Sequence, residues 1–264
     1  MFNTNNFRIK RNKLEFNEDG TPVRAYLNDD PGHAIKVDRP TYEHLSLNEE
    51  YNGYRDMVWT PIDLPYLDID MDHIADLAED PGLQKNFYVT KNVGPLIFIK
   101  PNRCGMAGEN PEWYDFAKQE LSEVIDYIET LPFTAIHQAF FVQAPKAIPA
   151  HYDEEHGMAE ILKRQAPSHL HFRWSKVTDY RNEHFYMTRD SDATQVYPML
   201  PPATNAFAYD GAVYEHGVDR GCNMRDRMQL VIHGVYDMPK WHNLLENSWN
   251  KYKEYAITTE HFNL

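Results

Sequence analysis

The sequence predicts a mostly β protein with a jelly-roll core and supporting α-helices. Beyond Phe133 the chain is a series of short runs rich in aromatic and β-branched residues, among them TAIHQAFFVQA, HLHFRWSKV and DRMQLVIHGVY. Turns rich in Pro, Gly and Asp separate these runs, and short strands at this spacing are typical of sandwiches and barrels. The two longest runs with helical periodicity, 111–131 and 241–257, lie on either side of this region.

A chain of 264 residues is long enough to form one domain with a substantial core. We expect a single domain, residues 1–264, in three parts. Residues 1–132 form an N-terminal αβ support, residues 133–238 form the jelly-roll core, and residues 239–264 form a C-terminal helix that braces one sheet.

The elements of the N-terminal part follow from local patterns. Residues 1–60 are polar and rich in turns, so we expect edge strands and loops there. DIDMDHIADLAED combines an Asp N-cap with helical spacing of apolar residues, which predicts a short helix near 69–79. NFYVT and GPLIFIK are typical of strands. Residues 101–115 are expected to be a long loop, either a lid or plain surface, and the run that starts at Pro111 is expected to be the strongest helix.

Composition excludes several classes of protein. The net charge of −14 argues against a nucleic-acid backbone as the main partner. Cys104 and Cys222 form neither a disulfide framework nor a zinc motif. The chain has no apolar run long enough to span a membrane, and its N-terminus lacks the apolar core of a signal peptide. We therefore expect a cytoplasmic protein without nucleic-acid or membrane partners, and the composition leaves the oligomeric state open.

Three polar positions in the second half form a ligand set. His151 and Asp153 lie in IPAHYDEEHG, and His216 lies in YDGAVYEHGVD. His-x-Asp with one distant His is the ligand set of a mononuclear non-haem Fe(II) site, although zinc accepts the same ligands. Residues two apart in a strand project to one face, so one metal can meet both members of the triplet. The alternatives are exposed polar side chains for the triplet and a hydrogen-bonded strand histidine for His216.

A cationic residue follows the second histidine. Arg227, in NMRDRMQLVIHG, carries a planar fork suited to the far carboxylate of a 2-oxoacid. Arg225 is expected to share its strand face, and we favour Arg227 because it directly precedes the apolar run. The alternative for either arginine is a surface salt bridge, with Asp219 or Asp226 as the nearest acids in the sequence.

The run HLHFRW places three side chains that can carry positive charge on one strand face: His169, His171 and Arg173. The other face of the same strand is apolar. Burial of the cationic face in an apolar core without partners would be costly. This face is therefore either exposed to solvent or lines a cavity that receives anions, and the second alternative fits a dicarboxylate cosubstrate.

Taken in order, IPAHYD, HLHFRWSKVTD and YEHGVDRGCNMRDRMQLVI resemble the Fe(II)- and 2-oxoglutarate-dependent dioxygenases, most closely the aspartyl/asparaginyl β-hydroxylase-type branch. KVTD and DRMQLVI occupy the places of that branch's trailing elements, and the resemblance covers residues 133–238. It implies a double-stranded β-helix, iron at the three ligands and 2-oxoglutarate at Arg227. Asp153 is a departure, because the animal enzymes of that branch lack this carboxylate.

The resemblance implies hydroxylation of an unactivated C–H bond with Fe(II), 2-oxoglutarate and O2. The substrate is expected to be an amino acid, a peptidyl side chain or a small metabolite. His169, His171, Arg173 and Arg225 are further candidates for cosubstrate binding. Two alternatives remain: a zinc hydrolase, for which no HExxH motif supplies a base, and a non-catalytic cupin-like binding protein. The acid that a cupin needs shortly after His-x-His is absent.

Overall fold

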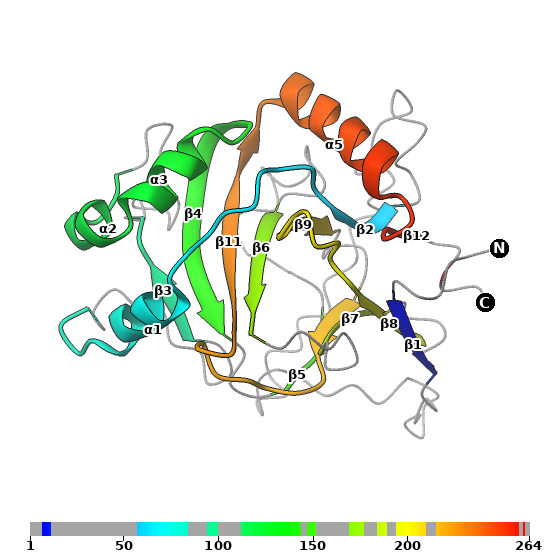
Figure 1. Cartoon of the computed structure of the whole chain (residues 1–264), viewed down its shortest axis with the longest axis horizontal. Helices are drawn as coiled ribbons and strands as arrows, with labels where there is room; N and C mark the ends of the chain where they lie inside the picture. The colour runs from blue at the N-terminus through cyan, green and yellow to red at the C-terminus, as the bar shows by residue number, and fades with distance from the viewer. Residues whose placement is uncertain are drawn as a thin grey trace, which may run out of the picture.

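The computed structural model describes residues 7–11, 57–83, 94–99, 112–143, 147–151, 169–176, 184–188, 194–209, 215–258 and 261. In this part of the chain the fold is mostly β, and its strands pair antiparallel in two sheets (Figure 1). The smaller sheet has the order β1 (Phe7–Arg11), β8 (Thr194–Pro198), β7 (Phe185–Thr188), β10 (Glu215–Val218), β5 (Ile148–His151). The larger sheet has the order β12 (Ile257–Thr258), β2 (Met57–Pro61), β9 (Ala206–Tyr209), β6 (His169–Ser175), β11 (Arg227–Tyr236), β4 (Phe133–Gln143), β3 (Gly94–Ile97).

Strands between β4 and β11 are distributed over both sheets. β4, β6, β9 and β11 belong to the larger sheet, whereas β5, β7, β8 and β10 belong to the smaller one. The chain therefore crosses between the sheets repeatedly, and pairs such as β4–β11 and β5–β10 join strands that are far apart in the sequence.

Strands from outside residues 133–238 extend both sheets. β1 forms one edge of the smaller sheet, as expected of an N-terminal edge strand, and β2 and β3 join the larger one. β12 pairs with β2 and comes from the segment after the last helix. The N-terminal part is thus continuous with the sheets as well as supporting them.

Three helical predictions can be compared with the structure. The predicted helix near 69–79 is confirmed as α1 (Met71–Glu79), and the carboxylate of Asp70 caps it by accepting hydrogen bonds from two backbone N–H groups. The strongest predicted helix is divided into α2 (Asp115–Glu120) and α3 (Ser122–Glu129), because the buried residue Leu121 has φ −128° and ψ 26°, outside the helical region. The C-terminal helix is α5 (Met238–Tyr252).

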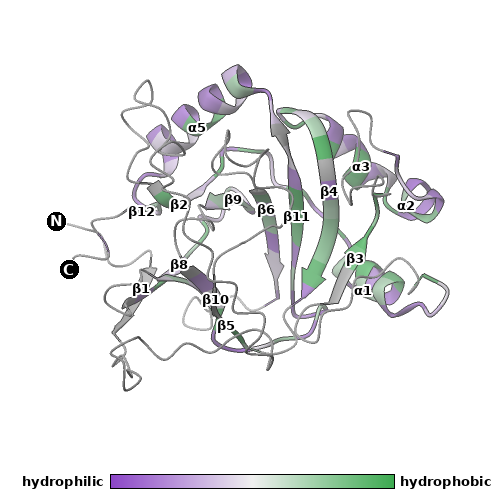
Figure 2. Cartoon of the chain, turned by 180° about the vertical axis from the view of Figure 1, so that it is seen from behind, coloured by the Kyte–Doolittle hydropathy of each residue, from purple (hydrophilic) through white to green (hydrophobic). Residues whose placement is uncertain are grey.

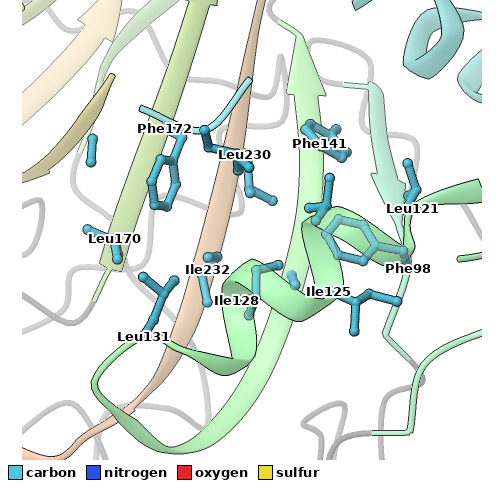
Figure 3. Close-up of a cluster of buried hydrophobic side chains, with 14 of the residues drawn as sticks. Phe98, Leu121, Ile125, Ile128, Leu131, Phe141, Leu170, Phe172, Leu230 and Ile232 are labelled. Atoms are coloured by element: carbon cyan, nitrogen blue, oxygen red, sulfur yellow. The ribbon is translucent and has the colours of Figure 1, made fainter. Parts of the chain in front are cut away.

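Two apolar cores lie on opposite faces of the larger sheet. The helix-side core joins Leu170, Phe172, Leu230 and Ile232 of the sheet to Ile128 of α3 (Figure 3). In Figure 2, β4 is largely hydrophobic, β11 carries both hydrophobic and hydrophilic residues, and the helices show hydrophilic turns. The core between the two sheets includes Trp59, Phe185, Met187, Phe207 and Tyr209. None of the helices in the described residues combines the length and apolar character that a membrane-spanning helix needs.

Candidate functional site

A cavity of about 290 Å³ lies between the two sheets. Strands β4, β6, β9 and β11 supply one wall, and β5, β7 and β10 supply the other. Ligand pockets begin at roughly 300 Å³. A cavity of this size therefore suits a small-molecule ligand rather than a macromolecule.

β11 contributes the most polar part of the wall. Arg227, Gln229, Val231 and His233 all line the cavity, because alternate side chains of a strand project to the same face. Leu230, between them, lies in the helix-side core. β11 thus carries a polar stripe into the cavity, with Arg227 at its beginning and His233 further along.

The neighbouring strands β6 and β4 extend this stripe into three rows across the sheet. Each row takes the name of its residue on β11, and residues that lie directly opposite each other on two neighbouring strands are called register partners. The rows, from β6 through β11 to β4, are Arg173–Gln229–Val142, His171–Val231–Phe140 and His169–His233–Gln138. Arg227, whose register partner is Ser175, precedes the Gln229 row.

The two candidate arginines lie in different places. Arg227 is buried, with 7% of its surface exposed, and lines the cavity. Arg225 instead binds α1, with its Nη2 atom 2.6 Å from Asp76 and 3.0 Å from Glu79. The expected common face does not exist, because β11 begins only at Arg227 and residues 224–226 form a turn. The structure therefore does not bring Arg225 into the cavity, and its acids come from α1 rather than from Asp219 or Asp226.

The ion pairs on α1 shift two pKa values. Hydrogen bonds to Asp76 and Glu79 raise the pKa of Arg225. Lys176, at the end of β6, donates to Asp72 at 2.8 Å and lowers the pKa of that carboxyl group. These cations attach α1 to the chain segments that adjoin β6 and β11.

His216 lies on the opposite wall from β11. It is buried, lines the cavity and contacts two aromatic rings, with centroid distances of 4.8 Å to Tyr209 and 6.0 Å to Phe185. Its register partner on β5 is His151. Register partners lie directly opposite each other in an antiparallel pair, so backbone positions 151 and 216 are adjacent. Asp153 and the side chain of His151 lie outside the described residues, and the convergence of all three ligands remains a prediction.

His171 and Phe172 of β6 lie on opposite faces of the strand, as expected, whereas Arg173 is not among the residues that line the cavity. His171 is only 4% exposed and lines the cavity, where its ring lies 5.1 Å from Phe207 and 4.7 Å from Tyr209. The guanidinium of Arg173 lies 5.8 Å from the Phe207 ring. His171 is therefore a cavity residue rather than a solvent-exposed one. The side chain of His169 lies outside the described residues.

Gly217 fits β10 into the smaller sheet beside His216. A Cβ atom at this position would lie 2.6 Å from the carbonyl oxygen of Ile148 and 2.6 Å from the hydroxyl of Tyr186. Any larger residue would push against the neighbouring strands on both sides. Glycine at this position thus allows the close pairing that places His216.

The lining residues that sequence reasoning missed include Gln138, Tyr209 and His233. His233 could have been found from Arg227, because alternate residues of a strand project to the same face and the two are six residues apart on β11. Gln138 could not be found in this way. Its position depends on the pairing of β4 with β11, two strands that are far apart in the sequence.

The described cavity wall favours anions. It contains Arg227, three histidines and three glutamines, and none of the lining residues that the structure describes is Asp or Glu. This contrasts with a net charge of −14 for the whole chain. A buried guanidinium interacts strongly with an anion, because water screens their attraction less than at the surface.

No family model matches the chain, and no curated protein matches it. Among solved structures, the chain is similar to a 2OG-Fe(II) oxygenase family oxidoreductase from Burkholderia pseudomallei, with 13% identity over 66% of this chain and 96% of that one and a TM-score of 0.33. It is also similar to a prolyl-4-hydroxylase from Pseudomonas putida, with 10% identity over 70% of this chain and 96% of that one and a TM-score of 0.36. Both values are too low to establish a shared fold or activity.

Proposed function

We propose that the protein is an Fe(II)- and 2-oxoglutarate-dependent oxygenase that hydroxylates a C–H bond. The observation that carries the proposal is the placement of His216 and Arg227. The sequence pattern selects both residues, they lie on strands of different sheets, and both are buried in the wall of one cavity. Two unrelated surface residues would not be expected to lie in the wall of the same cavity.

The strand order supports a jelly roll of the double-stranded β-helix type. In such a fold two antiparallel sheets face each other and the chain passes between them. The distribution of β4 to β11 over two sheets, with the cavity between them, agrees with this arrangement. On the strength of KVTD and DRMQLVI, we place the chain nearest the aspartyl/asparaginyl β-hydroxylase-type branch, with Asp153 as a departure from it.

The residues present fit a metal held on the smaller sheet. His216 is buried on the cavity wall, position 151 is its register partner, and Asp153 follows two residues later. His151, Asp153 and His216 would hold Fe(II), for which imidazole and carboxylate are suitable ligands. Zinc would also suit these three ligands, so the metal has to be identified from the reaction that the loaded protein catalyses.

The residues on the larger sheet fit 2-oxoglutarate. Arg227, which is buried and lines the cavity, would hold the far carboxylate in a charged hydrogen-bonded pair. When bound, iron and oxoglutarate supply the oxygen-dependent oxidation that side chains alone do not perform. The chain's own residues bind and orient the reactants and exclude water from between the sheets.

The decisive experiment is anaerobic loading of the purified protein with Fe(II), followed by addition of 2-oxoglutarate and O2 and measurement of succinate. We expect succinate to form with Fe(II) and not with Zn(II), and to be greatly reduced in the His216→Ala variant. Oxoglutarate binding without succinate from any tested substrate would favour a binding protein. Hydrolysis with Zn(II) and no succinate would favour a zinc hydrolase.

A further inference from the structure

The cavity has a second polar end, formed by His233 of β11 and Gln138 of β4. The two are register partners and both line the cavity. His233 is 6% exposed, and its ring meets that of Phe140 edge-on at 5.5 Å. At about 3.3 Å per residue of extended strand, the backbone of His233 lies roughly 20 Å from that of Arg227.

His216 lies between these two ends. Tyr209 contacts both His216 and His171, and His171 belongs to the Val231 row. The Val231 row lies between Arg227 and the His233 row on the same strand. The proposed metal ligand is therefore level with the middle of the cavity, with one polar end on each side of it.

The two ends cannot both be occupied by oxoglutarate. Under the proposed function, on which this inference rests, that molecule lies between His216 and Arg227. The His233 end then remains for the substrate. The apolar ring of Phe140, in the row before His233, offers a surface for hydrocarbon next to the polar end.

The chemistry of this end selects an anion. An imidazole and a carboxamide both offer N–H donors, and no described lining residue is acidic. We infer that His233 and Gln138 bind a carboxylate of the substrate, which is therefore a small free carboxylic acid such as an amino acid. The described cavity, at about 290 Å³, is at the lower end of the size range of ligand pockets, which favours a small substrate.

Binding can be tested without turnover by saturation-transfer NMR on protein saturated with oxoglutarate and Zn(II). The probes are the twenty free L-amino acids and their carboxamides. We expect one or more of the free acids to bind more tightly than the corresponding carboxamide, by roughly tenfold or more. The amide carries no charge, so a hydrogen bond to a charged group is lost.

Two variants test the residues. His233→Leu and Gln138→Leu should each weaken binding of that acid roughly tenfold or more, while oxoglutarate affinity stays within about twofold. His73→Leu on α1 and Gln119→Leu on α2 are matched controls outside the cavity and should bind as the wild type does. Circular dichroism checks folding. If the substitution at the buried position His233 prevents folding, the Gln138→Leu variant, at a half-buried position, still provides the test.

Three results would overturn the inference: no free acid of the panel binds, carboxamides bind as tightly as acids, or both cavity variants bind the acid as the wild type does. Failure of the proposed function gives a different result. In that case oxoglutarate itself does not bind, or Fe(II)-dependent succinate never forms.

Discussion

Arg225 and Arg227 are two residues apart, yet one binds the outer helix α1 and the other lies in the cavity between the sheets. The two side chains contact different parts of the protein because Arg225 lies in the turn at residues 224–226, whereas Arg227 is the first residue of β11. The same short segment therefore attaches the sheet to its helix and supplies the cation of the proposed site.

Substitution of these arginines should separate the two roles. Arg227→Ala removes the charged partner of the oxoglutarate carboxylate and should weaken oxoglutarate binding by roughly ten- to a hundredfold, about 1.5–3 kcal/mol. Arg225→Ala loses only ion pairs on the surface and should leave this affinity within about twofold. Isothermal titration calorimetry with oxoglutarate measures both variants. Equal losses in the two would contradict the assignment of Arg227.

Asp153 determines the expected reaction outcome. Its carboxylate would fill a metal position that a halogenating site leaves to chloride, so the wild-type product should gain oxygen and no chlorine, even in high chloride. Asp153→Ala should lose hydroxylation and bind Fe(II) more weakly, because one anionic ligand is removed. Product mass and metal content after gel filtration give the two readings. A chlorinated product from the wild type would rule out the role given to Asp153.

Gly217 should tolerate no side chain. In Gly217→Ala the added methyl group meets the Ile148 carbonyl oxygen and the Tyr186 hydroxyl, and overpacking of this kind costs about 1–3 kcal/mol. Urea unfolding measures the loss. Gly82→Ala is a matched control in the exposed turn after α1, where the nearest atom belongs to the side chain of Asp80 at 3.1 Å. We expect a clearly smaller loss there, and similar losses at both sites would refute the argument.

The Asp72–Lys176 pair should make stability depend on pH under acid conditions. The pKa of Asp72 is lowered from 3.8 in the folded protein, chiefly by the hydrogen bond from Lys176. A depressed folded pKa contributes stability above the unfolded value, and this contribution is lost as the pH falls through the folded value. The stability of Asp72→Asn should therefore be closest to that of the wild type in acid, and the difference should grow toward neutral pH. Urea midpoints from about pH 2 to neutral test this, and a constant difference would contradict it.

Local patterns were sufficient for much of the fold. The Asp70 cap predicted α1, and period-two alternation in HLHFRW correctly separated His171 from Phe172. Such features depend on residues close together in the chain. The two residues with the clearest chemistry, His216 and Arg227, could also be selected, because their types and order are specific even without coordinates.

Other features depend on relations that a single sequence does not encode locally. Gln138 lines the cavity because β4 pairs with β11, a strand far away in the sequence. Arg225 found its acids on α1, far away in the sequence. The break at Leu121 interrupts a pattern that is otherwise continuous for a helix, and its backbone angles could not be read from residue types.

The interior position of β11 in the larger sheet has a consequence for synthesis of the protein. β11 pairs with β6 on one side and β4 on the other, although both precede it in the chain. During translation these two strands emerge with unpaired edges and wait for a partner that is made later, and exposed edges of this kind promote association between chains. The polar stripe from Arg227 to His233 arrives with β11. The wall proposed to bind anions therefore cannot form before β11 has joined β4 and β6 in the larger sheet.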